Sequence, residues 1–403
     1  MSLELACRDC GLLQRVPEVP NRHVVECARC GRVLITRAVG RVDLPLVLAL
    51  CALLLLLASA LAPQLSVSTF GAERSSGMLS GARIFAAQGF PELGALVLIC
   101  AVVLPFTFLS ALVWVLGSVH FGATGQPYLG RLYRWVGTIR PWMMLEVFLV
   151  GGFVAYTRIQ TVATIEIAVG GWCFIAATFA SLLALTQLDD RTVWNALPRP
   201  EPAEIKGRPR VACTGCDLLV PASHDACPRC QARLHTRKPD AFRRTAALII
   251  AGYLLYIPAN LLPVTTLAGG GGDEDHTIMS GVFELIHNNL WPLAVIVFVA
   301  SIVLPLLKLI SLTWMLIAVR LRSARLLRTR TRLYRTIDAI GRWSNIDVFM
   351  GSVLAALLQF GALTTVRAEP GLVAFAAVVV ITMVATETFD SRLMWDAADE
   401  SAA

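Results

Sequence analysis

The sequence has none of the common signatures of phosphate-driven or hydrolytic chemistry. It contains no G-x-x-x-x-G-K-[ST] phosphate loop, no H-E-x-x-H motif and no G-x-S-x-G motif. We also expect no secretory signal, because the first 43 residues are polar and cysteine-rich instead of a short basic stub followed by an apolar run. These absences exclude the familiar ATP-driven and hydrolytic enzymes, and we expect no enzyme activity.

Charge is scarce as well. Only 16% of the 403 residues are charged, whereas 56% are hydrophobic and the mean hydropathy is +0.66. A helix that crosses a hydrocarbon core of about 30 Å needs about 20 apolar residues, and several runs approach that length. The composition therefore predicts an all-α polytopic membrane protein. We expect eight spans, at roughly 44–63, 93–119, 142–163, 165–188, 244–266, 290–319, 345–366 and 371–389.

Basic residues are distributed unevenly among the segments between these spans. If the amino terminus is cytoplasmic, 30 of the 35 Lys and Arg residues fall in the cytoplasmic segments 1–43, 120–141, 189–244, 320–343 and 390–403. Both termini should therefore face the cytoplasm. The net charge of +7 then reflects membrane topology and anionic lipid, and we expect no nucleic-acid partner.

The chain contains an internal repeat of about 200 residues. "VLPFTFLSALVWVL" at 103–116 recurs as "VLPLLKLISLTWML" at 303–316, and "LDDRTVWNA" at 188–196 recurs as "FDSRLMWDA" at 389–397. Each copy is a cysteine-rich head followed by four spans, so the two copies have the same topology. We divide the chain into head 1, module 1, a linker with head 2, module 2 and a tail, at 1–43, 44–190, 191–243, 244–390 and 391–403.

The heads contain eight of the 11 cysteines. Their spacing is C-x2-C-x16-C-x2-C in head 1 and C-x2-C-x10-C-x2-C in head 2, and two such pairs form a tetrahedral thiolate site. We expect a zinc-ribbon-like fold with one structural zinc ion in each head, two in total. A dithiol redox pair is the alternative interpretation. The predicted ligands are Cys7, Cys10, Cys27, Cys30, Cys213, Cys216, Cys227 and Cys230.

These features together resemble a known family. Tandem cysteine heads that each precede four spans, a Leu-Tyr-Arg motif at 132–134 and 333–335, and a W-x-x-x-[DE]-V-F entry to the third span are similar to the paraquat-inducible protein A family. The resemblance implies a bacterial inner-membrane subunit. It also implies a periplasmic MCE-domain tunnel protein as partner and phospholipid as the transported ligand.

One cation lies inside a predicted span. Lys308 has Phe108 as its counterpart in the first copy, so the fold tolerates an apolar residue there. A lysine at a helix centre costs about 3 kcal/mol and needs a polar partner or a function. We hypothesise a proton-coupled polar network; a static buried pair is the alternative. The network would combine Lys308 with Asp347, Glu387, Ser352, Thr382 and Thr386, and with Glu146, the counterpart of Asp347.

Prolines and two outer segments recur at matched positions. Prolines inside or at the ends of spans should kink or break them, at Pro63, Pro105, Pro263 and Pro305. The segments 75–92 and 273–290 should lie at the periplasmic surface as short interfacial helices that form a portal or meet the partner. Idle surface loops are the alternative. The shared portal residues are Met78, Gly81, Met279 and Gly281.

Three function classes fit this sequence. A lipid-transport subunit is favoured by the resemblance and by the duplicated membrane modules. A membrane-embedded zinc or thiol redox sensor would instead signal through reversible chemistry of the C-x2-C heads. A small-molecule exporter is the third class. Stoichiometric zinc with unreactive thiols would favour the first class over the second.

Overall fold

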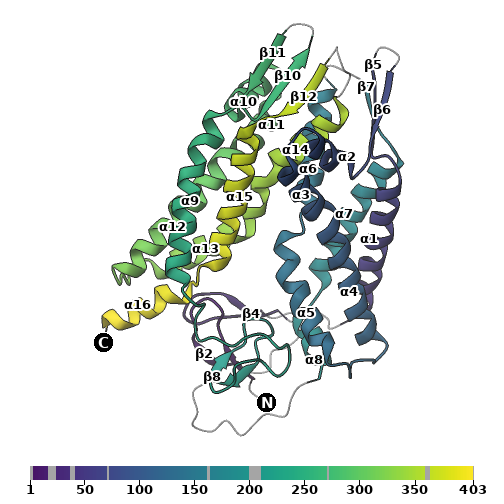
Figure 1. Cartoon of the computed structure of the whole chain (residues 1–403). Coiled ribbons are helices and arrows are strands. Elements are labelled where there is room, and N and C mark those ends of the chain that lie inside the picture. Colours follow the sequence, from purple (N-terminus) through teal and green to yellow (C-terminus); the bar gives the residue numbers. More distant parts are fainter. Residues whose placement is uncertain are drawn as a thin grey trace.

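The computed structural model describes residues 3–16, 24–36, 41–69, 72–160, 164–198, 210–269, 272–358 and 364–402. Seven helical segments in these ranges are long and apolar enough to span a membrane (Figure 1). The predicted class, a largely helical polytopic protein of two tandem modules, is confirmed. The segments are α1 (Asp43–Leu61), α3 to α4 (Pro91–His120), α5 to α6 (Tyr128–Ile159), α7 (Val169–Gln187), α9 (Ala241–Leu261), α11 to α12 (Trp291–Arg320) and α15 (Pro370–Thr388).

The predicted span at 345–366, the seventh of the eight, differs from the structure. Helix α14 (Ile346–Leu357) has 12 residues, which is about 18 Å at about 1.5 Å per residue. Strand β12 (Thr364–Ala368) follows it, and in module 1 strand β7 (Thr164–Ile167) likewise follows α6 (Leu145–Ile159). The predicted boundaries are wrong here because Thr, Val and Ile favour a pleated strand that can pair with a neighbour.

These strands belong to two small antiparallel sheets at the end of the molecule opposite the heads (Figure 1). The order is β6-β5-β7 in module 1 and β11-β10-β12 in module 2. Each hairpin directly follows the first long helix of its module, and the third strand arrives from the short helix α6 or α14. The sheets therefore join the helix ends on this side. The hairpin strands are β5 (Leu65–Thr69), β6 (Ala72–Ser76), β10 (Thr265–Gly269) and β11 (Gly272–His276).

Two glycines allow the first and last long helices of each module to pack closely. An added Cβ at Gly371 would lie 2.3 Å from the Pro263 carbonyl oxygen, and one at Gly170 would lie 2.6 Å from that of Pro63. The amide of Gly371 donates to Pro263 O at 3.0 Å, and Gly170 donates to Pro63 O at 2.9 Å. Helix α1 consequently packs along α7, and α9 packs along α15.

The two modules interlock through their short helices. α6 packs against α14, with the Phe148 and Phe349 rings 5.5 Å apart and in edge contact. α2 (Ser80–Ala87) of module 1 packs on α14 of module 2. In the reverse direction Val282 and Leu285 of α10 (Ile278–His287) cluster with Val154 of α6. Each module therefore contributes a short helix to the other.

Candidate metal centres and polar groups of the spans

Head 1 consists of two β-hairpins with a cysteine pair at the end of each first strand. β1 (Leu3–Ala6) pairs with β2 (Leu13–Val16), and β3 (Val24–Glu26) pairs with β4 (Val33–Thr36). Gly11 and Gly31 follow the second cysteine of each pair with φ of +73° and +66°. Glycine adopts this left-handed conformation without steric cost, so the chain can turn tightly around the sulfur atoms.

Head 2 repeats this arrangement with other residues at the turns. Strands β8 (Arg210–Ala212) and β9 (Leu219–Pro221) form its first hairpin, and an isolated bridge joins Ala226 to Arg233. Asp217 and Gln231 occupy the left-handed positions, with φ of 57° and 55°. The same backbone geometry is therefore present in both heads although only head 1 uses glycine.

The four sulfur atoms in each head are arranged to bind one metal ion. All four lie within 4.8 Å of one another. The Sγ to Sγ distance is 3.5 Å for Cys7–Cys30 and for Cys10–Cys27 in head 1, and 3.4 Å for Cys213–Cys230 and 3.6 Å for Cys216–Cys227 in head 2. Four thiolates at about 2.3 Å from a tetrahedral zinc ion are about 3.8 Å apart. The cysteines are free thiols that are at most 5% exposed, so both predicted clusters fit a metal.

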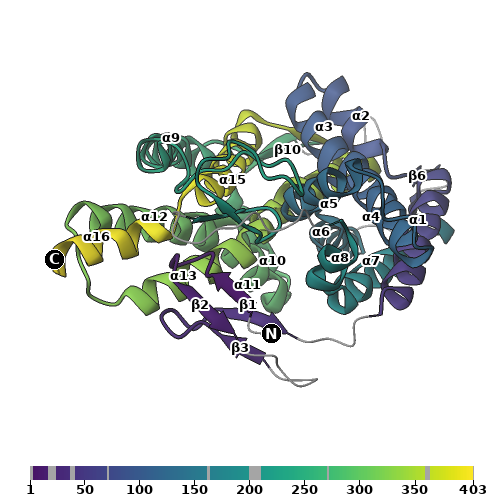
Figure 2. The same cartoon turned by 90° about the horizontal axis from the view of Figure 1, so that it is seen from below.

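Although Arg191 donates to Leu34 O at 2.7 Å, head 1 docks mainly on the module that it does not precede. It lies against α13 (Leu327–Ile340) and α16 (Arg392–Ala402) of module 2 (Figure 2). Arg335 donates to Asp9 at 2.6 Å, to the Cys30 carbonyl at 3.0 Å and to its sulfur at 3.4 Å. The guanidinium of Arg29 stacks 4.6 Å from the centre of the Trp395 ring.

Head 2 docks in the same manner on module 1. Arg229 lies 5.3 Å from the ring of Trp194 in α8 (Asp190–Ala196). Gly130 of α5 (Tyr128–Ile139) touches the head so closely that an added Cβ would lie 2.3 Å from Arg229 O. The two heads are therefore exchanged between the modules.

Sequence reasoning missed this exchange and the residues that make it. Arg29 and Arg229 both precede the last cysteine of their head, and Trp395 and Trp194 occupy matched positions after the two modules. The sequence signal for these residues is that the arginine and the tryptophan both recur at matched positions in the two copies. Nothing in a single copy indicates which module each head contacts.

The heads also contact each other. Arg8 of head 1 binds Asp217 of head 2 through two hydrogen bonds of 2.5 and 2.8 Å. Glu4 accepts from Arg15 at 3.0 Å and from Arg210 at 2.5 Å, and these hydrogen bonds lower the pKa of its carboxyl. Charge-assisted contacts of this kind hold the two heads together as one layer beneath the helices.

Lys308 lies at a polar site in the spans, and of its three hydrogen-bond partners only Thr382 belongs to the predicted network. Its ammonium is 2% exposed and donates to Gly341 O at 2.6 Å, to Ser344 Oγ at 3.1 Å and to Thr382 Oγ1 at 3.4 Å. Thr382 is thus a partner as predicted, and Thr386 donates to its carbonyl at 2.9 Å. A cavity of about 180 Å³ beside Lys308 is also lined by Arg140, Asp338, Arg342, Thr386 and Glu387.

Asp347 is not the partner of Lys308. Its carboxyl group is buried without a hydrogen bond among the described residues, and its polar neighbours are Ser301 and Arg158. Arg158 donates to Gly281 O at 3.0 Å, which connects this carboxylate to α10. The second module therefore has two separate polar sites, one around Lys308 and one around Asp347.

The remaining acidic groups and Ser352 have other surroundings. Glu146 pairs with Arg342 across the module interface at 2.9 Å. The backbone carbonyl of Glu387 accepts from Lys238. Ser352 packs on α2, where an added Cβ at Gly81 would lie 2.8 Å from it. None of these three contacts Lys308 through a hydrogen bond or ion pair in the described ranges.

The four matched prolines lie in two kinds of position, one pair at the start of a helix and the other pair beyond the end of a helix. Pro105 and Pro305 lie in the first turn of α4 (Leu104–His120) and α12 (Leu304–Arg320), directly after π-helical turns at Ile99–Val103 and Val299–Val303. A π turn and a proline both locally perturb the helical hydrogen-bond ladder. Pro63 and Pro263 lie beyond the ends of α1 and α9, so they do not kink those helices.

The predicted portal segments contain the short helices α2 and α10, and each of them packs against the other module. Met78 is only 2% exposed, and Gly81 contacts Ser352 of the other module. Their counterparts Met279 and Gly281 differ, since Met279 is 38% exposed and Gly281 contacts Arg158. Within the described residues, the second-module segment is the one that presents its methionine outward.

The fold and the heads define a multi-pass membrane protein of two repeated modules, each with an appended cluster of four cysteines that could hold a metal ion. The sequence pattern of the paraquat-inducible protein A family matches residues 42–198 and 242–399, and the chain belongs to this family. The matched ranges coincide with the two modules and leave out most of both heads.

Similar proteins cover nearly the whole chain. The intermembrane transport protein PqiA of Escherichia coli K12 is 28% identical over 98% of this chain and 96% of its own length. The lipophilic envelope-spanning tunnel protein A of the same strain is 29% identical over 97% of this chain and 91% of its length. A probable intermembrane transport protein of Haemophilus influenzae is 28% identical over 97% and 95%. No solved structure matches the chain.

We expect two tightly bound metal ions per chain in protein purified without chelator, because four preorganised thiolates bind a divalent ion strongly at neutral pH. Elemental analysis of purified protein measures this ratio. The double substitution Cys213→Ser and Cys216→Ser should remove one ion per chain and lower the folded yield. The control Cys51→Ser, at an exposed thiol in α1, should keep both ions. A wild-type value clearly below two contradicts the assignment.

Proposed function

We propose that this protein is the inner-membrane subunit of an intermembrane lipid-transport system. It passes lipid, with phospholipid as the substrate, between the inner membrane and a periplasmic tunnel protein built from MCE domains, and it is not an enzyme. The observation that carries the proposal is the similarity over nearly the full chain to proteins named for intermembrane transport and for an envelope-spanning tunnel.

The distribution of charge supports an orientation with the heads and both termini in the cytoplasm. The N- and C-terminal parts of the chain both lie at the head end of the molecule (Figure 1). The basic helix α13 and the arginines of the heads lie at this end, where anionic lipid and the positive-inside rule favour them. The two sheets then face the periplasm, where the tunnel partner would meet them.

The metal in each head is zinc with a structural role in this proposal. Four thiolates leave no open position for substrate, which is typical of structural zinc. The cysteine sulfurs are buried, and Arg335 donates to Cys30, so the thiols are shielded from oxidants. This shielding favours a structural site over the redox sensor.

The buried polar groups of module 2 are candidates for coupling transport to proton movement. Lys308 and Asp347 have different polar neighbours, and both are at most 7% exposed. Ionisable groups inside membrane segments are rare and often mark ion or proton pathways. In the coupled cycle, Lys308 and Asp347 change charge or partners as lipid moves, together with Ser344, Thr382 and Ser301.

A photo-crosslinking residue at Met279 tests the proposed periplasmic contact. The side chain is 38% exposed, so in intact cells it should capture an MCE-domain protein or lipid. The same residue at Met78, which is 2% exposed, is the matched control and should capture only other parts of this chain. Absence of both partner and lipid products at Met279 argues against the proposed assembly.

Replacement of Lys308 tests the coupling role. In Lys308→Met the volume is retained, and Ser344 and Thr382 keep their hydrogen bonds to Gly341 O and Val379 O. We expect a normal folded yield with transport lowered about tenfold or more, measured by complementation of a strain that lacks the protein. The control Leu307→Met, at a 37% exposed neighbour, should behave as wild type. Full complementation by Lys308→Met contradicts the role.

A further inference from the structure

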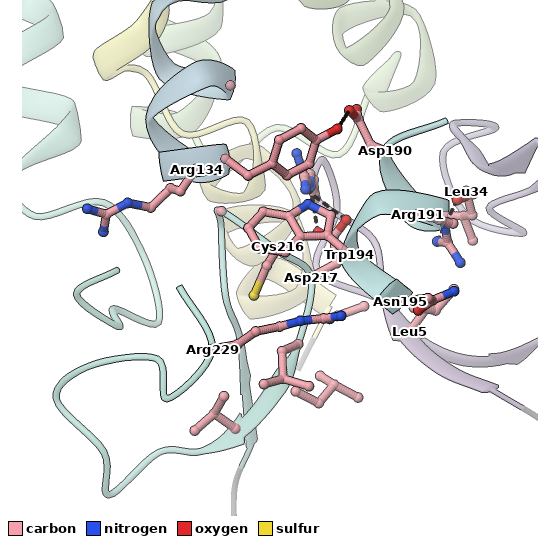
Figure 3. Close-up of a pocket in the computed structure, with 18 of the residues that line it drawn as sticks. Leu5, Leu34, Arg134, Asp190, Arg191, Trp194, Asn195, Cys216, Asp217 and Arg229 are labelled. Atoms are coloured by element: carbon pink, nitrogen blue, oxygen red, sulfur yellow. Dashed lines mark hydrogen bonds and ion pairs between the residues drawn. The ribbon is translucent and has the colours of Figure 1, made fainter. Parts of the chain in front are cut away.

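A large cavity lies between the heads and module 1. Its volume is about 900 Å³, and it is lined by head 2, head 1, α5, α8 and the ends of α4 and α7 (Figure 3). Cavities of about 300–1,000 Å³ are typical of small-molecule sites. Nothing in the metal centres or the polar groups of module 2 accounts for it.

Its charged lining has an excess of arginine. Seven arginines and four acidic residues line the cavity. All four acids are already engaged: Glu4 and Asp217 accept from arginines, Asp190 accepts from the Tyr133 hydroxyl at 2.5 Å, and Asp189 caps the start of α8. The guanidinium groups of Arg134 and Arg140, by contrast, form no hydrogen bond or ion pair with the described residues. The cavity is therefore electropositive.

The repeat shows why Arg134 has no carboxylate partner. Arg134 and Arg335 are the arginines of the two Leu-Tyr-Arg motifs, and each faces the first cysteine pair of the exchanged head. In head 1 this pair contains Asp9, which binds Arg335 at 2.6 Å. In head 2 the corresponding residue is Gly215, whose added Cβ would lie 3.1 Å from Arg134 Cγ. The carboxylate that neutralises one arginine is missing beside the other.

Arg140 is a second cation that only module 1 has. The aligned position in module 2 is Gly341, which offers its carbonyl to Lys308 at 2.6 Å. Arg140 lines the large cavity and also borders the small cavity beside Lys308. The two halves therefore differ in two ways: Arg134 lacks the carboxylate partner that Arg335 has, and Arg140 is replaced by Gly341 in module 2.

The cavity has an apolar part as well. It reaches into the helix bundle of module 1, where Phe108, Leu185 and Leu188 line it. Phe108 is the counterpart of Lys308, so the repeat places an apolar ring here and a cation in module 2. A cavity with arginines at the heads and apolar side chains toward the spans fits a ligand with an anionic head and an acyl chain.

We propose that the cavity binds the phosphate headgroup of an anionic phospholipid through Arg134 and Arg140, with its acyl part beside Phe108. Guanidinium groups suit phosphate because their planar donors pair with two oxygens at once. The site does not depend on transfer of lipid to a tunnel partner. It can therefore be tested in the isolated full-length protein, whatever the result of the transport experiments.

Native mass spectrometry of the purified protein with phosphatidylglycerol and phosphatidylcholine of identical chains tests the site. We expect phosphatidylglycerol to bind about tenfold more tightly, and Arg134→Gln with Arg140→Gln to abolish that preference. Gly215→Asp, which restores the carboxylate found in head 1, should abolish it without removing an arginine. Two metal ions per chain and an unchanged unfolding temperature verify that each variant is folded.

The control is Arg243→Gln with Arg244→Gln, which removes two exposed charges at the head end of α9. It should leave the preference unchanged. Equal binding of the two lipids, or an equal loss in the control, overturns the proposal. Inorganic phosphate that binds as tightly as the lipid assigns the site to a soluble phosphate compound and also overturns it.

Discussion

The stacking of Arg29 on Trp395, with its counterpart Arg229 on Trp194, is the interaction on which the architecture depends. Each arginine lies in a metal-binding turn, and each tryptophan follows the last long helix of a module. Because each head contacts the module that it does not precede, neither module is complete without the other half of the chain. A metal-ordered turn positions each arginine, so loss of metal should loosen the contact between the halves as well as the head itself.

The modules are interlocked at the opposite end too. α2 packs on α14, and α10 packs on α6. Gly81 permits this approach on one side, and Arg158 binds Gly281 O on the other. Both ends of the modules are in contact, and Glu146, Arg342 and Asp347 lie on or beside the contact between α6 and α14. The buried polar groups are thus located where relative movement of the modules would change their partners.

Much of the fold, and part of the candidate site, could be predicted from the sequence. The repeat, the spacing of the cysteines and the long apolar runs predicted the tandem architecture, the two four-cysteine clusters and seven of the spans, because each is visible as a pattern in the sequence. Two of the partners of Lys308 could not be predicted. They are a backbone carbonyl of Gly341 and a hydroxyl of Ser344, and only the packing of the helices brings these common groups next to the ammonium. Asp347 was wrongly paired because charge alone suggested it. The span predicted at α14 was too long, because the apolar sequence of this helix continues toward the residues that form β12.

Exchange of the heads is the central claim, and a photo-crosslinking residue at Ala28 tests it most directly. Ala28 is exposed, and its carbonyl accepts from Arg328 of α13 at 3.1 Å. After irradiation of the full-length protein in membranes and digestion, peptide mass spectrometry should find Ala28 joined to residues 327–340. Crosslinks to the equivalent helix of module 1, residues 128–139, would show that head 1 docks on its own module and would contradict the account.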